Sequence, residues 1–403
     1  MRCTRTIRYN MRRSFFFLPL GLICAAFTAG IAPAVAAPEY RVELVAPNTT
    51  GTGEARAVNA TGDVAGVYND AAFIWQAGHF RSFPAERSFY LGDSFKNIAT
   101  AINIAGTAVG VDGEYTPCSM SGLELTSAVT YNADGMHFID RSRDGQCSFE
   151  ADGINDRGTI VGESGFRGFV RYADGHELSV EPLSTRPENN GTRATALDNE
   201  NHIVGGTTID VANVPQIKVG EETPAGGMTR PMYGPDLNAY VIHAFMLTVD
   251  GTRQRMRDLG ALSGFPDTIA TAINEDLTVV GYSGNASGPK WTRVSGPSHA
   301  WVWLRGRMTD LGSSHIVLGV KEDVDSYAYG VNDAGVIVGC SREEAVRWVN
   351  KRMQNLNALI DRHSGWHLTC ARGINRSGTI VGTGEFGNSG SLPFRLVPLT
   401  AGR

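Results

Sequence analysis

A pattern of apolar and polar positions about ten residues long recurs seven times along the chain. Each copy has a small and an aliphatic residue, a polar turn containing Asn or Asp, and a short aliphatic run ending in glycine. The copies occupy residues 57–66, 101–110, 153–162, 196–205, 272–281, 330–339 and 373–382. Asn and Asp bond their own backbone and glycine accepts positive φ, so the turn favours a tight hairpin. The pattern predicts strand, turn and strand rather than a helix.

A second apolar stretch follows each copy, as in "AAFIWQ" at residues 71–76 and "HAWVWL" at residues 299–304. In six copies this stretch runs directly into another short turn and a last strand, such as "RMTDLG" at residues 307–312. One repeat is therefore four strands, a to d, with tight hairpins between a and b and between c and d. Stacked neighbours would bury a shared apolar core.

The two ends of the chain complement each other. The seventh copy lacks a fourth strand, whereas "YRVELV" at residues 40–45 is a strand with no a, b or c strand before it. An all-β, seven-bladed β-propeller of four-stranded blades, with the N-terminal strand completing the last blade, accounts for both observations and removes exposed sheet edges. An open solenoid is the competing arrangement, and it would need polar caps at both ends.

Additional residues between some repeats indicate where loops are elaborated. The longest insertion, residues 209–242, falls between strands b and c of the fourth blade, and shorter ones are expected at residues 111–127 and 283–298. In an up-and-down blade the a–b and c–d hairpins emerge on one face, so the b–c loops and the d–a crossovers share the opposite face. We call this opposite face the insertion face.

The first 36 residues resemble an export signal. Five arginines precede the apolar run "FFFLPLGLICAAF", and Ala34-Val35-Ala36 forms an A-x-A cleavage site. A retained membrane anchor is the alternative, but Pro and Gly interrupt the apolar run. We expect a mature domain of residues 37–403 with no membrane span, exported to the periplasm or the exterior of a bacterial cell by the general or the twin-arginine route. Its net charge is −10, from 31 basic and 41 acidic residues, which disfavours nucleic-acid partners.

Four cysteines stay in the mature chain, an even number that suits two disulfides in an oxidising compartment. Cys118 and Cys340 are expected in b–c loops, and Cys147 and Cys370 in the d–a crossovers that follow. Each of the pairs Cys118–Cys147 and Cys340–Cys370 would join a b–c loop to the following crossover, with a similar number of residues between the two cysteines. This equivalence favours these pairs over other connectivities. Zinc is the alternative for four cysteines, but no C-x-x-C pair is present.

The segments "AINEDLTVVGYS" and "SHAWVWLRGRMTDLG" resemble the HAF-repeat family of extracellular repeat proteins. The name-giving triplet is His243-Ala244-Phe245 here, and it is varied as His299-Ala300-Trp301. The resemblance implies export and a repeat fold, and no established activity. His243 and His299 occupy equivalent positions, so we expect them to form structural hydrogen bonds between blades rather than to serve catalysis or metal binding.

No catalytic or cofactor motif stands out. The sequence has no nucleophile elbow, phosphate-binding loop or dinucleotide fingerprint. The acidic turns lack the alternating carboxylates of a calcium loop, so we expect neither a metal nor another cofactor. Candidate ligand-binding residues are instead the aromatic and arginine side chains of the insertions: Arg230, Tyr233, Tyr240, Trp291 and Arg293. They could equally fold back over the blade edges.

Three hypotheses for function remain open. The first is a monomeric, non-enzymatic binding module that recognises a glycan or an extracellular protein through the insertion face. The second is an extracytoplasmic polysaccharide hydrolase or lyase, for which acids and a His or Arg should converge at the centre of the ring. The third is a structural surface protein without a pocket.

Overall fold

The structure of the chain, a computed structural model, describes residues 37–84, 95–117, 124–139, 149–185, 191–210, 218–222, 230–233, 240–286, 294–312, 315–317, 320–322 and 324–399. The predicted export segment, residues 1–36, lies outside this range, and its removal stays a prediction. No helix among the described residues is long and apolar enough to cross a membrane.

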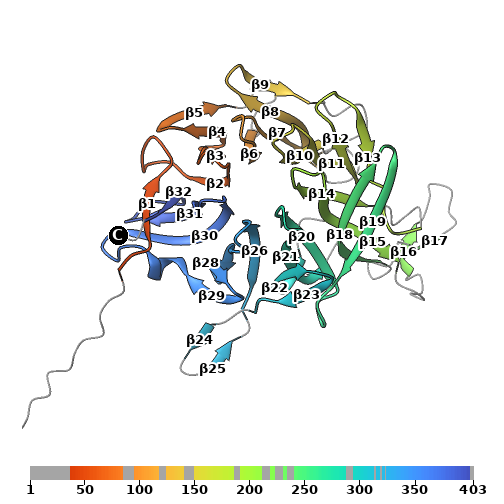
Figure 1. Ribbon diagram of the computed structural model, residues 1–403. Helices are drawn as coiled ribbons and strands as arrows, with labels where there is room; N and C mark the ends of the chain where they lie inside the picture. Colours follow the sequence, from red (N-terminus) through yellow and green to blue (C-terminus); the bar gives the residue numbers. More distant parts are fainter. Residues whose placement is uncertain are drawn as a thin grey trace, which may run out of the picture. The chain divides into compact units, whose positions relative to one another are not determined.

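Seven antiparallel four-stranded sheets confirm the predicted seven-bladed propeller. The first strand of each blade lies nearest the centre and the fourth outermost (Figure 1). The first three blades are β2 (Gly53–Val58), β3 (Val64–Tyr68), β4 (Ala71–Gln76) and β5 (His79–Phe83); β6 (Phe95–Ile102), β7 (Ala108–Pro117), β8 (Glu124–Asn132) and β9 (Gly135–Phe138); and β10 (Phe149–Ile154), β11 (Ile160–Ser164), β12 (Arg167–Arg171) and β13 (Glu177–Ser179). The next three are β14 (Thr192–Leu197), β15 (Ile203–Asp210), β18 (Tyr240–Asp250) and β19 (Arg253–Gly260); β20 (Asp267–Ile273), β21 (Val279–Ala286), β22 (Val294–Leu304) and β23 (Arg307–Asp310); and β26 (Ser326–Val331), β27 (Ile337–Ser341), β28 (Glu344–Val349) and β29 (Arg352–Asn355).

The seventh blade closes the ring as predicted. It consists of β30 (Trp366–Ile374), β31 (Ile380–Phe386), β32 (Leu392–Pro398) and the N-terminal strand β1 (Tyr40–Leu44). Strand β1 pairs with β32 along its whole length, from Tyr40 opposite Pro398 to Leu44 opposite Phe394. The apolar core lies between blades: Ile74 of the first blade packs in one cluster with Val129 and Tyr131 of the second.

The turn of each repeat links neighbouring blades through its Asn side chain, which the sequence did not predict. The side-chain N–H of Asn59 donates to the backbone carbonyl of Asn103 at 2.9 Å, and Asn375 donates in the same way to Asn59, across the closure of the ring. The equivalent bonds run from Asn103 to Asn155, Asn155 to Asp198, Asn274 to Asn332, and Asn332 to Asn375. The seventh bond of this ring would run from residue 198 to Asn274, but residue 198 is an aspartate and its side chain has no N–H to donate.

The smaller insertions differ from the prediction. Residues 111–127 and 283–298 were expected to be loops, but β7 and β8 pair as far as Pro117 and Glu124, and β21 and β22 as far as Ala286 and Val294. These insertions therefore lengthen the b–c hairpins, because the added residues continue the ladder. The long insertion contains a separate hairpin of β16 (Lys218–Glu222) and β17 (Arg230–Tyr233).

Two further elements interrupt the crossovers. A hairpin of β24 (His315–Val317) and β25 (Val320–Glu322) follows the fifth blade, and the 3-10 helix η1 (Leu356–Leu359) follows the sixth. Neither was predicted.

The predicted disulfide between Cys340 and Cys370 is present, but its placement was wrong. Cys340 lies in β27, not in a loop, because the turn after it is only Arg342 and Glu343, both at positive φ. Cys370 lies in β30, the first strand of the next blade, so the bond joins two blades. Cys118 and Cys147 lie outside the described residues.

Each of the two repeat histidines lies within hydrogen-bond distance of an aspartate of its own blade, whereas bonds between blades were expected. The Nδ1 atom of His243 lies 3.0 Å from the Asp258 carboxylate, and that of His299 lies 2.9 Å from Asp310. The reason is the antiparallel c–d pairing, which places the start of strand c opposite the end of strand d.

Candidate functional site

Every inner strand carries a β-bulge at the same position of the repeat. The residue before the bulged one is always a buried alanine, such as Ala55 or Ala328. A bulge redirects its side chain and is frequent beside functional sites. The bulged residues, in blade order, are Arg56, Thr100, Asp152, Thr195, Thr271, Tyr329 and Arg372.

Three of these residues are threonines that fasten neighbouring inner strands. The hydroxyl of Thr100 donates to the Ala151 carbonyl of the next blade at 2.7 Å. Thr195 and Thr271 make the equivalent bonds to Ala270 and Ala328, also at 2.7 Å. The other four positions carry an arginine, an aspartate or a tyrosine. A threonine is sufficient for the inter-strand bond, so these larger or charged side chains need another explanation.

A cavity of about 730 Å³ opens where the inner strands of the sixth, seventh and first blades meet. Its wall includes Arg56, Tyr329 and Arg372 of the bulged positions, and Glu54 and Tyr327 two residues before them. The turn residues Asp70 and Glu343, each between strands b and c of its blade, also line it, so the cavity lies on the insertion face. We call it the inner-strand cavity.

Charged groups from two blades are held together in its wall. Glu54 accepts a hydrogen bond from Arg56 Nε at 3.0 Å and forms an ion pair with Arg372 of the seventh blade. Burial raises the pKa of Glu54, but the two arginines outweigh this effect and hold it below its ordinary value. The Arg372 guanidinium also lies 4.3 Å from the ring centre of Tyr329.

A second charged cluster lies at the inner strands of the third and fourth blades. Arg193 binds Asp152 through Nε at 2.9 Å and Nη2 at 2.7 Å. The same guanidinium lies 2.7 Å from Glu150 and 3.2 Å from Glu163. Three carboxylates therefore share one cation.

Burial, and then the crowding of acids, shifts the proton affinity of these carboxylates. Burial raises the pKa of Glu163 to about 8. The attraction of Arg193 opposes this shift, and repulsion from Glu150 and Asp152 adds to it. Burial likewise raises the pKa of Asp152, while Arg193 and the more weakly acting Arg56 oppose it. Arg56 belongs to the wall of the inner-strand cavity, so the two clusters are near enough to act on each other.

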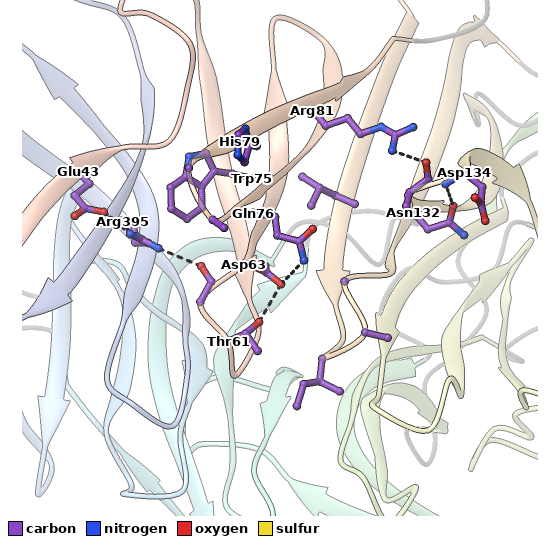
Figure 2. Close-up of a pocket in the computed structure, with 18 residues that line it drawn as sticks. Glu43, Thr61, Asp63, Trp75, Gln76, His79, Arg81, Asn132, Asp134 and Arg395 are labelled. Atoms are coloured by element: carbon purple, nitrogen blue, oxygen red, sulfur yellow. Dashed lines mark hydrogen bonds and ion pairs between the residues drawn. The ribbon is translucent and has the colours of Figure 1, made fainter.

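A second cavity, a groove of about 1180 Å³, lies on the opposite face along the hairpins of the first and second blades. Figure 2 shows Thr61 and Gln76 directed at the Asp63 carboxylate, at 2.9 and 3.1 Å. Trp75 is covered by the Arg395 guanidinium at 4.1 Å. These polar groups largely satisfy one another within the repeat turns, so the inner-strand cavity is the stronger candidate site.

The predicted ligand-binding residues fall where the structure does not describe side chains. Arg230 and Tyr233 lie in β17 and Tyr240 begins β18, but their side chains are outside the described part of the chain. Trp291 and Arg293 lie outside it entirely. Their role stays a prediction. Within the described residues, no group of His, Cys, Asp and Glu is arranged to hold a metal ion.

The repeat pattern did not predict the residues that line the cavity, because the pattern consists of the positions that the copies share. Their signal is a variable position inside a constant frame: the residue directly before each copy, which is the middle one of "ARA", "ATA", "ADG", "AYG" and "ARG". Constant positions serve the fold, so a variable inward position is where a site can be built.

Comparison with known proteins supports no family. No family model matches the chain, and no curated protein matches it. Among solved structures, the extracellular domain of a putative hybrid two-component system from B. thetaiotaomicron is 10% identical over 91% of this chain, with a TM-score of 0.48. This chain spans only 40% of that domain's length.

Two other solved structures are similar at the same low level. A gluconolactonase from Xanthomonas campestris is 12% identical, with 91% of this chain and 93% of that chain covered and a TM-score of 0.37. The β-propeller domain of the Trilobed protease from Pyrococcus furiosus is 11% identical, with 78% and 97% covered and a TM-score of 0.32. These likenesses carry no information about a ligand or a reaction.

Proposed function

We propose that this protein is an exported, non-enzymatic binding module that takes a glycan in the inner-strand cavity on the insertion face. The observation that carries the proposal is one cavity in which Tyr327, Tyr329 and the Arg56–Glu54–Arg372 ion pairs meet. A volume of about 730 Å³ suits one or two sugar rings. Tyrosine rings offer flat faces to a sugar, and paired charges offer donors and acceptors to its hydroxyls.

The other parts of this proposal concern the setting of the domain. A disulfide between blades suits an oxidising compartment, as does the A-x-A segment at residues 34–36. We propose periplasmic or extracellular export, a monomer, and membership of the HAF-repeat family on the sequence resemblance. The long insertion would form an outer rim around the ligand, through Arg230, Tyr233 and Tyr240 among others. Trp291 and Arg293 of the fifth-blade insertion would contribute in the same way.

A glycan array followed by calorimetry on residues 37–403 tests the glycan ligand. Tyr329→Ala removes one aromatic face and should weaken binding about tenfold or more. Gln76→Ala, in the groove on the opposite face, is the control and should bind as the parent does. Deletion of residues 211–239 tests the insertion separately. Equal affinity of the parent and Tyr329→Ala would place the ligand elsewhere.

A second candidate function is a polysaccharide hydrolase or lyase. The favouring observation is the convergence of Glu150, Asp152 and Glu163 on Arg193, because a carboxyl group with a pKa of about 8 is protonated at neutral pH and could act as a general acid. Release of reducing ends or unsaturated products from the bound glycan, abolished in Glu163→Gln, would establish this activity. Binding without turnover supports the module instead.

A further inference from the structure

Among the described residues, the lining of the inner-strand cavity has more carboxylates than guanidinium groups. Its lining contains two guanidinium groups, from Arg56 and Arg372, and four carboxylates, from Glu54, Asp70, Glu343 and Glu385. Glu54 is neutralised by the two arginines. Glu343 and Glu385 are exposed at the rim and make no ion pair within the described part of the chain. A cleft lined by one sign of charge concentrates ligands of the opposite sign.

The neighbouring cluster at Arg193 adds to this field. Three carboxylates, from Glu150, Asp152 and Glu163, surround one guanidinium, so the cluster is negative whenever more than one of them is ionised. Burial is the main cause of the raised pKa of Glu163; Arg193 opposes it, and the charges of Glu150 and Asp152 add to it. Both clusters therefore make the centre of the ring attractive to a cation.

The aromatic part of the cavity suits a cation as well. Tyr327 and Tyr329 lie on the same side of β26 with rings nearly parallel, at 12° and 6.1 Å between centres, and Tyr282 meets both edge-on. Tyr329 already holds the Arg372 guanidinium against its ring. Tyr327 holds no such cation among the described residues, although the face of a tyrosine ring attracts one.

We propose that the glycan taken in this cavity carries a free amino group, so that the ligand is a cationic amino sugar. The inference rests on the proposed glycan function and specifies its chemistry. An ammonium group offers three donors and one positive charge, which match the carboxylates of the rim and the ring of Tyr327 in the cavity wall. An acetylated amine has no charge, and a uronic acid has the wrong sign.

The test is calorimetry on residues 37–403 with three tetrasaccharides of matched length: β-1,4-linked glucosamine, its fully N-acetylated form, and a uronic-acid oligomer. At low salt the glucosamine tetramer should bind about tenfold more tightly than the acetylated one, and the difference should shrink at 0.5 M salt. Equal affinity for both would overturn the amino-sugar inference and leave the glycan function standing. Tighter binding of the uronic-acid oligomer would also overturn it. Failure of all three, together with a blank glycan array, would overturn the glycan function itself.

Two charge-matched variants locate the effect. Glu343→Gln and Glu385→Gln each remove one rim carboxylate and should each lower the affinity for the glucosamine tetramer about threefold, with little change for the acetylated one. Asp134→Asn makes the same change of charge on the opposite face, at an exposed carboxylate, and should bind as the parent does. All three sites are exposed turns or strand ends, so the variants should fold. An equal loss in Asp134→Asn would show that only overall charge matters and would overturn the assignment to this cavity.

Discussion

The repeat asparagine has two roles, and each is performed by a different polar atom of its side-chain amide. In the first blade, Asn59 Oδ1 accepts from the backbone N–H groups of Thr61 and Asp63 and so shapes its own turn. Its Nδ2 donates to the next blade. Asp198 keeps the first role, with bonds from Glu200 and His202, and cannot perform the second.

Asp198→Asn should therefore complete the ring of amide hydrogen bonds. The new N–H would reach the Asn274 carbonyl as its equivalents do, and it could also donate to His202 Nδ1, which now lies 2.6 Å from Asp198 Oδ2. We expect the free energy of unfolding to rise by about 1 kcal/mol, measured by urea denaturation.

The reverse change, Asn155→Asp, removes a present bond and places a carboxylate oxygen near the Asp198 carbonyl. It should destabilise the protein by about 1–3 kcal/mol. Stabilisation by Asn155→Asp, or destabilisation by Asp198→Asn, would contradict the linking role of the amide.

Glu163 makes stability depend on pH in an unusual direction. Its pKa is about 8 in the folded protein against an ordinary value of 4.5, so between these values the folded state holds a proton that the unfolded state has released. More bound protons in the folded state mean that stability falls as pH rises across this window.

Glu163→Gln should abolish that loss. Relative to the parent, the variant should gain stability steadily from about pH 5 to about pH 8, and the difference should level off above pH 8, where both forms of the parent are ionised. Urea denaturation at several pH values measures this. A difference between variant and parent that does not change with pH would contradict the raised pKa.

At the scale of the strand, the bulge explains the glycine that ends every repeat copy. In β15, a Cβ at Gly205 would lie 1.8 Å from the Arg193 carbonyl of the inner strand. The bulge brings that carbonyl close, and a backbone oxygen cannot move aside without breaking the sheet. The glycine is thus required by the neighbouring strand rather than by its own conformation.

Two adjacent glycines of β15 allow a matched comparison. Gly205→Ala should destabilise the protein by about 2–4 kcal/mol, because the inner strand must shift. At Gly206 the new Cβ would lie 3.2 Å from a methyl group of Ile242, which can adjust, so Gly206→Ala should cost about 1 kcal/mol or less. Thermal and urea denaturation decide between them, and similar costs at both positions would contradict the steric role of the bulge.

For the whole molecule, the sequence was sufficient wherever a physical requirement recurs once per blade. The hairpin turns and aliphatic runs recur once per blade, so the number of blades could be predicted. The unmatched strand at residue 40 complements the incomplete last copy, so ring closure could be predicted as well. The site could not. The bulge that turns Arg56 and Arg372 inward depends on strand register, and the partners Glu54 and Arg372 are far apart in the sequence. Cys340 was placed in a loop because the two-residue turn after it has no glycine to mark it.

Ring closure depends on a strand that the chain supplies from its other end. Beyond its ladder with β32, β1 is held by Arg347 of the sixth blade, whose Nη1 donates to the Tyr40 hydroxyl at 2.7 Å and whose Nη2 lies 2.6 Å from the Glu39 carboxylate. Tyr40 and Val45 are buried between blades. Removing this strand therefore exposes both an apolar surface and the edge of β32.

A protein that begins at residue 47 should lose about 5 kcal/mol of stability and should self-associate through the exposed edge of β32, as shown by denaturation and light scattering. A synthetic peptide of residues 37–46, added in trans, should restore both the stability and the monomer, because its ladder and its bonds to Arg347 need no covalent connection. A peptide with Tyr40→Ala should restore them poorly, since it lacks the buried ring and the hydroxyl. If the truncated protein is as stable as the parent, or the parent peptide rescues no better than the Tyr40→Ala peptide, the strand does not close the ring in the manner described.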